Sequence, residues 1–417
     1  MKICIKRGAH QIGGSCVEIA ADNGKKIVID IGMPLSEDFI EPSSVFLPEI
    51  EYDGLEALFI SHPHGDHYML AGFLEKKIPV YIGRAAAAII NAANSYGRNK
   101  VELRDTQPVE NEIQFTIAGT FRVTPYLTDH SAYDSYMFMI EADGKRVLYT
   151  GDFRNHGRKA FRVNNMMAHP PKNIDVMLIE GTNVYPPETE TAETDAAQKP
   201  DKSFISEEDL EKKFQKEFEQ AKGIAAVWSS CQNIDRLVTI FKAAKAAKRK
   251  LVLPWQIGYI VKKIGNGKLP GFNYYPDVYK YKTNPEKRHE INTEQLAKNP
   301  EKYVVFLTSR ITGDLLNAGL FNSDAVFIWS LWNGYKRQEH TAQTLNAIAA
   351  TGAKIADDLH VSGHASLTTL VEFVDKLNPS RLVPVHTEHP QSFKTLEWNS
   401  GFTGKVETHA DGEWFEV

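Results

Sequence analysis

From residue 1 to about 183, short apolar runs alternate with polar turns. The runs are KIVIDIG, ALFIS, VYIG, FRVTPYL, YMFMIEA, RVLYTGD and DVMLIEG, with a few helical stretches between them. Apolar runs of about four to eight residues that are bounded by turns are typical of β-strands. The pattern therefore predicts a sandwich of β-sheets with helices on its outside.

The pattern changes near residues 186–204, where the segment PPETETAETDAAQKPDK has few apolar residues and predicts an exposed connecting loop. A helix is predicted over SEEDLEKKFQKEFEQAKG, with Ser206 as its cap. Beyond it, strands such as KLVLPW and YVVFLTS alternate with helices such as DRLVTIFKAAKAAK, which predicts a parallel sheet. After about residue 350, a strand, a helix and a strand are expected to rejoin the first domain. The predicted organisation is α/β, with residues 1–190 and 349–417 in one domain and residues 205–348 in an inserted domain.

Length and composition fit a globular protein of this size. The chain has 417 residues, of which 42% are hydrophobic and 24% are charged, and its formal net charge is -5. The sequence shows neither a secretion signal nor an apolar stretch of about 18 residues, so we expect no membrane contact. Its cysteines, Cys4, Cys16 and Cys231, are too far apart for a CxxC site, which favours a reducing compartment. We therefore expect a cytoplasmic protein.

Four side chains of metal-ligand type are concentrated in the segment SHPHGDHYML. They are His62, His64, Asp66 and His67, and Gly65 lets the backbone turn between them. A loop at the end of the run ALFI can direct two of them toward one ion and two toward a second ion about 3.5 to 4 Å away. The alternative interpretation is a solvated polar turn with coincidental histidines.

Further ligands are expected where other apolar runs end. His130 follows FRVTPYLTD, Asp152 follows RVLYTG and His386 follows RLVPV. Each of these residues alone is more often a capping or surface residue, but together with the first segment they predict two metal sites bridged by Asp152. One site is predicted from His62, His64 and His130, and the other from Asp66, His67 and His386. Imidazole and carboxylate ligands without thiolate suit zinc, with manganese or iron as alternatives.

The motifs HPHGDH, TDHS, YTGDFR and VHTEH, in this order, resemble those of the metallo-β-lactamase superfamily. LIEGT, HVSGHAS and SCQNIDR resemble further motifs of its β-CASP nuclease branch, which includes ribonuclease J and the RNA-cleaving subunit of mRNA 3′-end processing. The resemblance extends from about residue 13 to 389. It implies an αββα sandwich with an inserted α/β β-CASP domain.

The resemblance also implies roles for single residues. It makes Glu180 an acidic residue that supports the metal site, His364 a histidine near the scissile phosphate, and His386 a metal ligand. The sequence departs from ribonuclease J in one place, because FLTSRITGDLL stands where that enzyme has a Gly-rich phosphate-binding run. The resemblance therefore does not imply that this protein degrades RNA processively from a 5′-monophosphate end.

These residues support hydrolysis of phosphodiester bonds. Two bridged metal ions generate a nucleophile from water at neutral pH and offset the charge of the phosphate. His364 is the candidate that gives a proton to the departing oxygen, unless it is a structural cap. Glu180 and Asp66 are the carboxylates of the catalytic set, and Asp30 either supports a ligand or is structural. Gly13 and Gly14 are expected to form a tight turn beneath the site.

A basic segment lies within the predicted insertion. Residues 236 to 288 contain 13 Lys or Arg and two acidic residues, so their local charge is 13 minus 2, or +11. The predicted nucleic-acid contacts are Lys248, Arg249, Lys250, Lys262 and Lys263. Aromatic residues of the segment are Trp255, Tyr259, Phe272, Tyr274, Tyr275, Tyr279 and Tyr281. Basic groups beside aromatic rings are typical of a groove for single strands, although basic helix faces are often only solvated.

The leading functional hypothesis is a two-metal hydrolase that cleaves single-stranded RNA. A DNA nuclease of the same fold is one alternative, although His386 is typical of the RNA-acting members that the sequence resembles. A small-molecule hydrolase, such as a lactonase or thioesterase, is another, because HxHxDH occurs in those enzymes too. A non-catalytic binding module would have lost ligands, and none is visibly lost. The mode and direction of cleavage, sequence preference and oligomeric state stay open.

Overall fold

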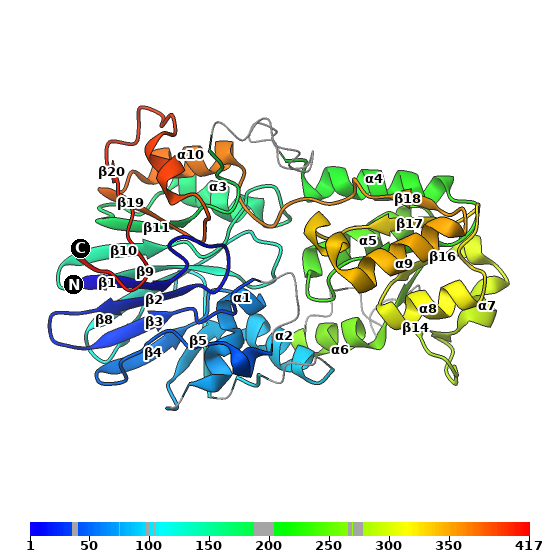
Figure 1. Cartoon of the computed structure of the whole chain (residues 1–417), viewed down its shortest axis with the longest axis horizontal. Helices are drawn as coiled ribbons and strands as arrows, with labels where there is room; N and C mark the ends of the chain where they lie inside the picture. The colour runs from blue at the N-terminus through cyan, green and yellow to red at the C-terminus, as the bar shows by residue number, and fades with distance from the viewer. Residues whose placement is uncertain are drawn as a thin grey trace. The chain divides into compact units, whose positions relative to one another are not determined.

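The computed structural model of the chain describes residues 1–35, 41–74, 76–96, 101–103, 105–186, 204–265, 269 and 278–417. The chain divides into two compact units (Figure 1). Unit 1 comprises Met1–Phe204 and Gly363–Val417, and unit 2 comprises Ile205–Ser362. Residues 187–203, which make up most of the predicted connecting loop, lie outside the described residues.

Unit 1 contains two sheets of seven strands each. The first has the order β21-β1-β2-β3-β4-β5-β6 and the second the order β20-β19-β11-β10-β9-β8-β7. The first consists of β1 (Lys2–Arg7), β2 (Cys16–Ala20), β3 (Lys26–Ile29), β4 (Leu55–Phe59), β5 (Val80–Gly83), β6 (Thr106–Val109) and β21 (Trp414–Glu416). The second consists of β7 (Phe115–Ile117), β8 (Phe121–Leu127), β9 (Tyr136–Ala142), β10 (Lys145–Tyr149), β11 (Val176–Glu180), β19 (Arg381–Val385) and β20 (Lys405–Val406).

The inner faces of the two sheets form one hydrophobic core. Strand β9 shows how the sequence builds it, because its side chains alternate between the two faces. Phe138 and Ile140 belong to the core between the sheets, where Phe138 meets Phe59 of β4 with ring centroids 5.2 Å apart. Met137 and Met139 belong to the core on the outer face of the same sheet. A strand buried on both faces reads as the continuous apolar run that predicted it.

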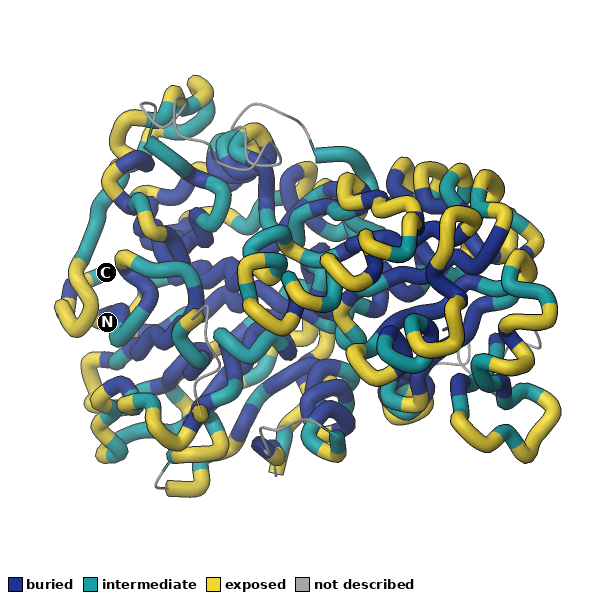
Figure 2. Tube along the Cα trace, turned by 45° about the vertical axis from the view of Figure 1, so that its right-hand side comes forward, coloured by how far each residue is buried: buried dark blue, intermediate teal, exposed yellow. Residues whose placement is uncertain are grey.

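Helices cover the outer face of each sheet. On the first sheet, α2 (Arg84–Asn94) packs with strand β5 in one buried cluster. On the second sheet, α3 (Ala160–Ala168) and α10 (Leu367–Leu377) pack in another. Shorter helices of the unit are α1 (Gly65–Tyr68), η1 (Pro42–Ser44), η2 (Met69–Phe73) and η6 (Pro390–Lys394). Unit 1 is thus the αββα sandwich that the sequence predicts, and much of its trace is coloured as buried in Figure 2.

Unit 2 is built on a seven-stranded sheet in which the ladders are all parallel. In the order of the sheet, the strands are β15 (Glu290–Ile291), β14 (Val278–Tyr281), β13 (Lys250–Leu253), β16 (Tyr303–Phe306), β12 (Ala225–Trp228), β17 (Val326–Trp329) and β18 (Lys354–Ala356). The helices are α4 (Glu207–Gln220), α5 (Ile234–Ala246), α6 (Trp255–Ile264), α7 (Thr293–Ala297), α8 (Ser309–Asn317), α9 (Glu339–Ala350), η4 (Pro300–Lys302) and η5 (Asn333–Arg337). The predicted parallel sheet is confirmed, and Ser206 caps α4 by accepting a hydrogen bond from Asp209 N at 3.0 Å.

The return of the chain to unit 1 differs from the expectation at residue 349. Strand β18, which was expected to rejoin the first domain, pairs in parallel with β17 at the edge of the sheet of unit 2. The boundary between the units therefore falls between Ser362 and Gly363. Among the described residues, no helix is long and apolar enough to span a bilayer.

Candidate metal centre

The polar residues of the candidate site lie where strands of unit 1 end. Strands β3 and β4 run parallel, as do β10, β11 and β19, so their carboxyl ends meet at common edges of their sheets. The site residues beyond or at these ends, and beyond β8, are Asp30, His62, His64, Asp66, His67, His130, Asp152, Glu180 and His386. Gly13 and Gly14, which were expected in a tight turn, have φ of +82° and +69°, values that favour glycine.

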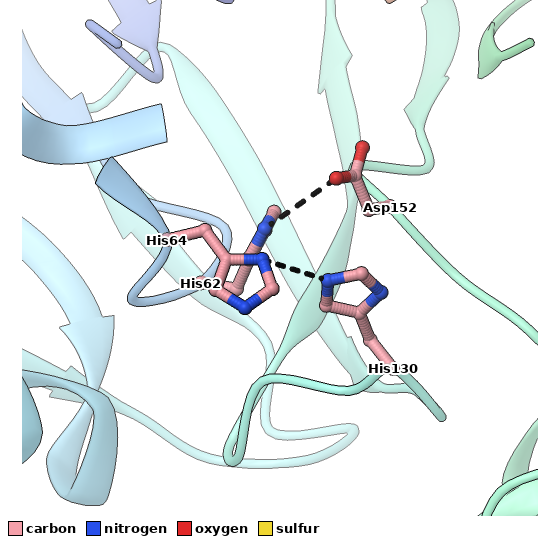
Figure 3. A group of neighbouring side chains, drawn as sticks. All are labelled: His62, His64, His130 and Asp152. Carbon is pink, nitrogen blue, oxygen red and sulfur yellow. Dashed lines mark hydrogen bonds and ion pairs between the residues drawn. The ribbon is translucent and has the colours of Figure 1, made fainter. Parts of the chain in front are cut away.

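The first ligand group consists of His62, His64, His130 and Asp152, whose ligand atoms all lie within 4.8 Å of one another. His62 Nε2 lies 3.5 Å from Asp152 Oδ2, and His64 Nδ1 lies 3.1 Å from His130 Nε2 (Figure 3). The four side chains reach this position from three different loops. This is the first of the two sites predicted from the sequence, with Asp152 within it.

The second ligand group consists of Asp66, His67 and His386, again with ligand atoms within 4.8 Å of one another. Nε2 of His386 lies 3.2 Å from Oδ2 of Asp66. Asp152 reaches this group as well, because its Oδ2 lies 3.2 Å from Nε2 of His67 and its Oδ1 lies 3.6 Å from Nδ1 of His386. The carboxylate of Asp152 is therefore close to both groups, as a bridging ligand must be.

Hydrogen bonds on the far side of three rings fix which nitrogen faces the centre. Nδ1 of His130 donates to Gly363 O at 2.5 Å, and Nδ1 of His67 donates to Asp30 Oδ2 at 2.8 Å. Nδ1 of His62 lies 2.9 Å from Ser61 Oγ. Because the hydroxyl of Ser61 donates its proton to Asp30 Oδ2 at 2.7 Å, its oxygen accepts the hydrogen bond from His62. Each ring thus presents the lone pair of Nε2 inward, the form that binds a metal ion.

The polar atoms of the centre fit a cation. Nε2 of His62, Nε2 of His67 and Oδ1 of Asp152 are buried, and none has a hydrogen-bond partner among the described residues. A buried polar atom without a partner costs free energy, and nitrogen lone pairs that face one another repel. Metal ions would satisfy these atoms together, and a donor set of imidazoles and carboxylates favours zinc or manganese.

Burial and neighbouring charges also shift the pKa values of the histidines in the centre. Burial lowers the pKa of His62 and His130 well below the usual value and that of His64 to about 4, which keeps all three neutral. Burial alone would lower the pKa of His67 too, but neighbouring carboxylates, Asp152 first, raise it well above its usual value. The negative potential at the inner nitrogen of His67 therefore attracts a positive charge.

Asp30 holds this part of the centre together. It is fully buried just after β3, with φ of +59°, and accepts hydrogen bonds from Ser61 N at 2.7 Å and from Tyr149 OH at 2.8 Å. It also accepts the bonds from Ser61 Oγ and His67 Nδ1 described above. Asp30 therefore orients the rings of His62 and His67, so the supporting role rather than the purely structural one fits the structure.

Glu180 and His364 form a third group of possible ligands with Asp152 and His386, again with ligand atoms within 4.8 Å of one another. Glu180 Oε2 is 2.9 Å from Nδ1 of His364, and Glu180 Oε1 accepts from Phe153 N at 2.9 Å. Burial lowers the pKa of His364, but the carboxylates of Glu180 and Asp152 outweigh it and raise the pKa to about 9. Sequence reasoning gave no role to Thr182, whose Oγ1 lies within 3.1 Å of His364 Nδ1. A hydroxyl two residues after a strand end carries no specific sequence signal.

Two stretches of the chain match known families. Residues 11–197 match the family described as "Metallo-beta-lactamase superfamily", and residues 352–396 match "Zn-dependent metallo-hydrolase RNA specificity domain". Together these stretches contain every residue of the ligand groups. The chain therefore contains a domain of the metallo-β-lactamase superfamily. The predictions of a metal-dependent hydrolase and of divalent metal ions as its cofactor class are confirmed at the level of this superfamily.

Relatives extend along nearly the whole chain. Ribonuclease J of Mycoplasma genitalium is 24% identical over 411 residues, which cover 93% of this chain and 68% of the relative. Ribonuclease J of Helicobacter pylori (strain B128) is 23% identical over 452 residues, which cover 100% of this chain and 60% of the relative. These matches confirm the resemblance to the β-CASP branch. A solved structure of a protein of unknown function from Enterococcus faecalis V583, 21% identical with a TM-score of 0.79, covers 99% of each chain and shares the fold.

The structure of unit 2 removes one residue, Arg249, from the predicted nucleic-acid contacts. Arg249 is buried, and its guanidinium donates to the backbone oxygens of Gly223, Tyr303 and Ala221. It therefore serves the fold of the unit and is not a surface contact. Of the other candidates, Lys248, Lys262 and Lys263 are exposed, and Lys250 lies partly buried with its Nζ 3.2 Å from Tyr279 OH. The aromatic residues Phe272, Tyr274 and Tyr275 lie outside the described residues.

We expect Asp30→Asn to lower the affinity for zinc by about 10- to 100-fold, because an amide group can donate to His67 Nδ1 and favour the wrong tautomer. Chelator competition measures this affinity. The control is Asp134→Asn, because Asp134 also accepts backbone hydrogen bonds, from Ala85 N at 2.7 Å and Ala86 N at 3.1 Å, but belongs to no ligand group. Equal zinc affinity in Asp30→Asn and the wild type would show that Asp30 does not orient a ligand.

Proposed function

We propose that this protein is a two-metal ribonuclease that cleaves phosphodiester bonds of single-stranded RNA. The observation that carries the proposal is the position of Asp152, whose carboxylate lies within 4 Å of ligands from both groups. The match to an RNA specificity domain and the likeness to ribonuclease J support RNA as the substrate. Endoribonuclease YSH1 of Mycosarcoma maydis, 28% identical over 196 residues that cover 42% of this chain and 22% of the relative, adds to this support.

The two ligand groups would hold two divalent ions, zinc as the first candidate and manganese as the alternative. When bound, such ions lower the pKa of water and offset phosphate charge. The residues of the chain would keep the ions in place and Asp152 would bridge them. Asp66 contributes a negative charge at the second group: burial raises its pKa, but neighbouring histidines outweigh burial and hold the pKa below the usual range.

His364 is the residue that we assign to the departing oxygen. Its ring lies 5.3 Å from that of His130 and 5.7 Å from that of His386, between centroids, so it borders both ligand groups. Glu180 stabilises its protonated form by accepting from Nδ1. Nε2 of His364 is then the nitrogen from which a proton can be given to a leaving oxygen.

Unit 2 supplies the surface that we assign to the RNA strand. Lys263 Nζ lies 5.4 Å from the ring centroid of Tyr259, and Trp255, whose side chain is 44% exposed, lies 6.2 Å from the same ring. Basic groups that follow phosphates and rings that stack on bases are what single-strand binding requires. A small-molecule hydrolase would give this surface no role.

The direct test is incubation of zinc-loaded protein with end-labelled single-stranded RNA, the DNA of the same sequence and the two duplexes. The proposal expects cleavage of the single-stranded RNA in preference to the other three. Hydrolysis of DNA alone, or of none of the four, would contradict it. The same gel would show whether products appear from one end or from internal positions.

His364→Ala should keep the metal content and the RNA affinity of the wild type but slow cleavage by roughly 10² to 10⁴, the usual contribution of a positioned acid or base. Elemental analysis, RNA binding and single-turnover rates measure the three quantities. His169→Ala is the control, because His169 is exposed and belongs to no ligand group. Loss of a metal ion in His364→Ala would make this residue a ligand, and full activity would make it structural.

The double variant Lys262→Ala, Lys263→Ala should weaken RNA binding and flatten its salt dependence. The slope of log K against log salt should fall by about 0.7 for each phosphate that the variant no longer neutralises. Fluorescence anisotropy with a labelled RNA at several salt concentrations measures the slope. Lys212→Ala, Lys213→Ala is matched to it, since these lysines also follow one another on a helix of unit 2, on α4. Equal slopes in the two double variants would show that net charge, and not a local interaction, binds the strand.

A further inference from the structure

Thr182 contacts two histidines of the centre with one hydroxyl group. Its Oγ1 lies 3.0 Å from Nδ1 of His386 and 3.1 Å from Nδ1 of His364. His386 belongs to the second ligand group, and His364 is the residue assigned to the leaving oxygen. The hydroxyl is thus placed between the metal site and the acid.

The geometry fixes the proton of His386. Its Nε2 lies 3.2 Å from Oδ2 of Asp66, a member of the same ligand group. A ring nitrogen that binds a metal ion must offer a lone pair, so the proton of the neutral ring is on Nδ1. Nδ1 therefore donates to Thr182 Oγ1, in the way that ligating histidines generally donate to a supporting group.

The geometry also fixes a proton on His364. Its Nδ1 lies 2.9 Å from Oε2 of Glu180. An ionised carboxylate only accepts hydrogen bonds, so Nδ1 carries a proton that Glu180 and Thr182 share. A hydroxyl oxygen has two lone pairs, and the two ring N–H groups use both of them.

The turn that carries Thr182 is held in place. Glu180 Oε2 also accepts from Thr182 N at 3.4 Å. Gly181, just before it, has no room for a side chain, because a Cβ there would lie 2.6 Å from a ring carbon of Phe393 and 2.9 Å from Cβ of Thr387. The hydroxyl is therefore placed by strand β11 and by packing, and does not depend on a flexible loop.

We propose that Thr182 is a positioning residue whose hydroxyl couples the metal ligand His386 to the acid His364. Loss of the hydroxyl would leave Nδ1 of His386 without its acceptor and would free the ring to turn or to change tautomer. It would also loosen the ring of His364 on one side. The part of the proposal that concerns the acid rests on the proposed function, whereas the part that concerns metal binding does not.

Two variants separate the hydroxyl from the shape of the side chain. Thr182→Val keeps the shape and removes the hydroxyl, whereas Thr182→Ser keeps the hydroxyl and removes the methyl group. In chelator competition, we expect Thr182→Val to bind zinc about 10- to 100-fold more weakly, with Thr182→Ser close to the wild type. Circular dichroism checks folding, and Thr182→Ala replaces Thr182→Val if the latter does not fold.

Kinetics at saturating zinc test the hydrogen bond to His364. We expect Thr182→Val to lower kcat for RNA by about tenfold or more with little change in KM, because a hydrogen bond to a charged group is removed. A small phosphodiester with a p-nitrophenolate leaving group needs no proton, so its hydrolysis should slow much less. A purely structural role would slow both substrates alike.

Unchanged zinc affinity in Thr182→Val would overturn the proposal, and so would an equal loss in Thr182→Ser. Equal slowing of RNA and of the p-nitrophenyl ester would overturn the link to His364. The zinc measurement needs no RNA cleavage. A wild type that binds zinc but leaves RNA intact would therefore contradict the proposed function, while the zinc affinities of the variants still decide on Thr182.

Discussion

The electrostatics of the candidate site depend on the buried carboxylate of Asp152. Burial raises its pKa, but His386 and the other histidines around it outweigh burial and hold the pKa well below the usual value. Its Oδ1 has no hydrogen-bond partner among the described residues, and lone pairs of several imidazoles face the same space. Uncompensated burial of polar groups costs free energy, and bound cations would offset this cost. The arrangement therefore fits a metal centre.

The sandwich can hold these buried polar groups together because residues from both of its sheets support them. Asp30, after β3 of the first sheet, accepts hydrogen bonds from Ser61 and His67. Thr182, after β11 of the second sheet, contacts His386 and His364. Strands fix the ends from which the loops start, and hydrogen bonds on the far side of several rings select the nitrogen that faces inward. The proposed metal binding and proton transfer would thereby depend on the same rigid elements.

The sequence predicted which residues the fold brings together at the candidate site, because their signal is local. His62, His64, Asp66 and His67 stand within six residues, and His130, Asp152 and His386 each follow a strong apolar run. The supporting bonds were harder to predict, because Thr182 and Ser61 are ordinary hydroxyl residues until the fold brings rings beside them. Arg249 was misassigned because charge counting cannot show that a guanidinium lies buried against carbonyl groups. Strand β18 was expected in the wrong sheet because three residues do not reveal their partner.

The metal content of Asp152→Ala tests the shared carboxylate most directly. After zinc loading and gel filtration, the wild type should hold about two ions per chain, as a two-metal site requires. Asp152→Ala should lose both ions and its activity, since without the bridge two cations repel each other at short range. Elemental analysis that returned about two ions for the variant, together with full turnover, would contradict the account.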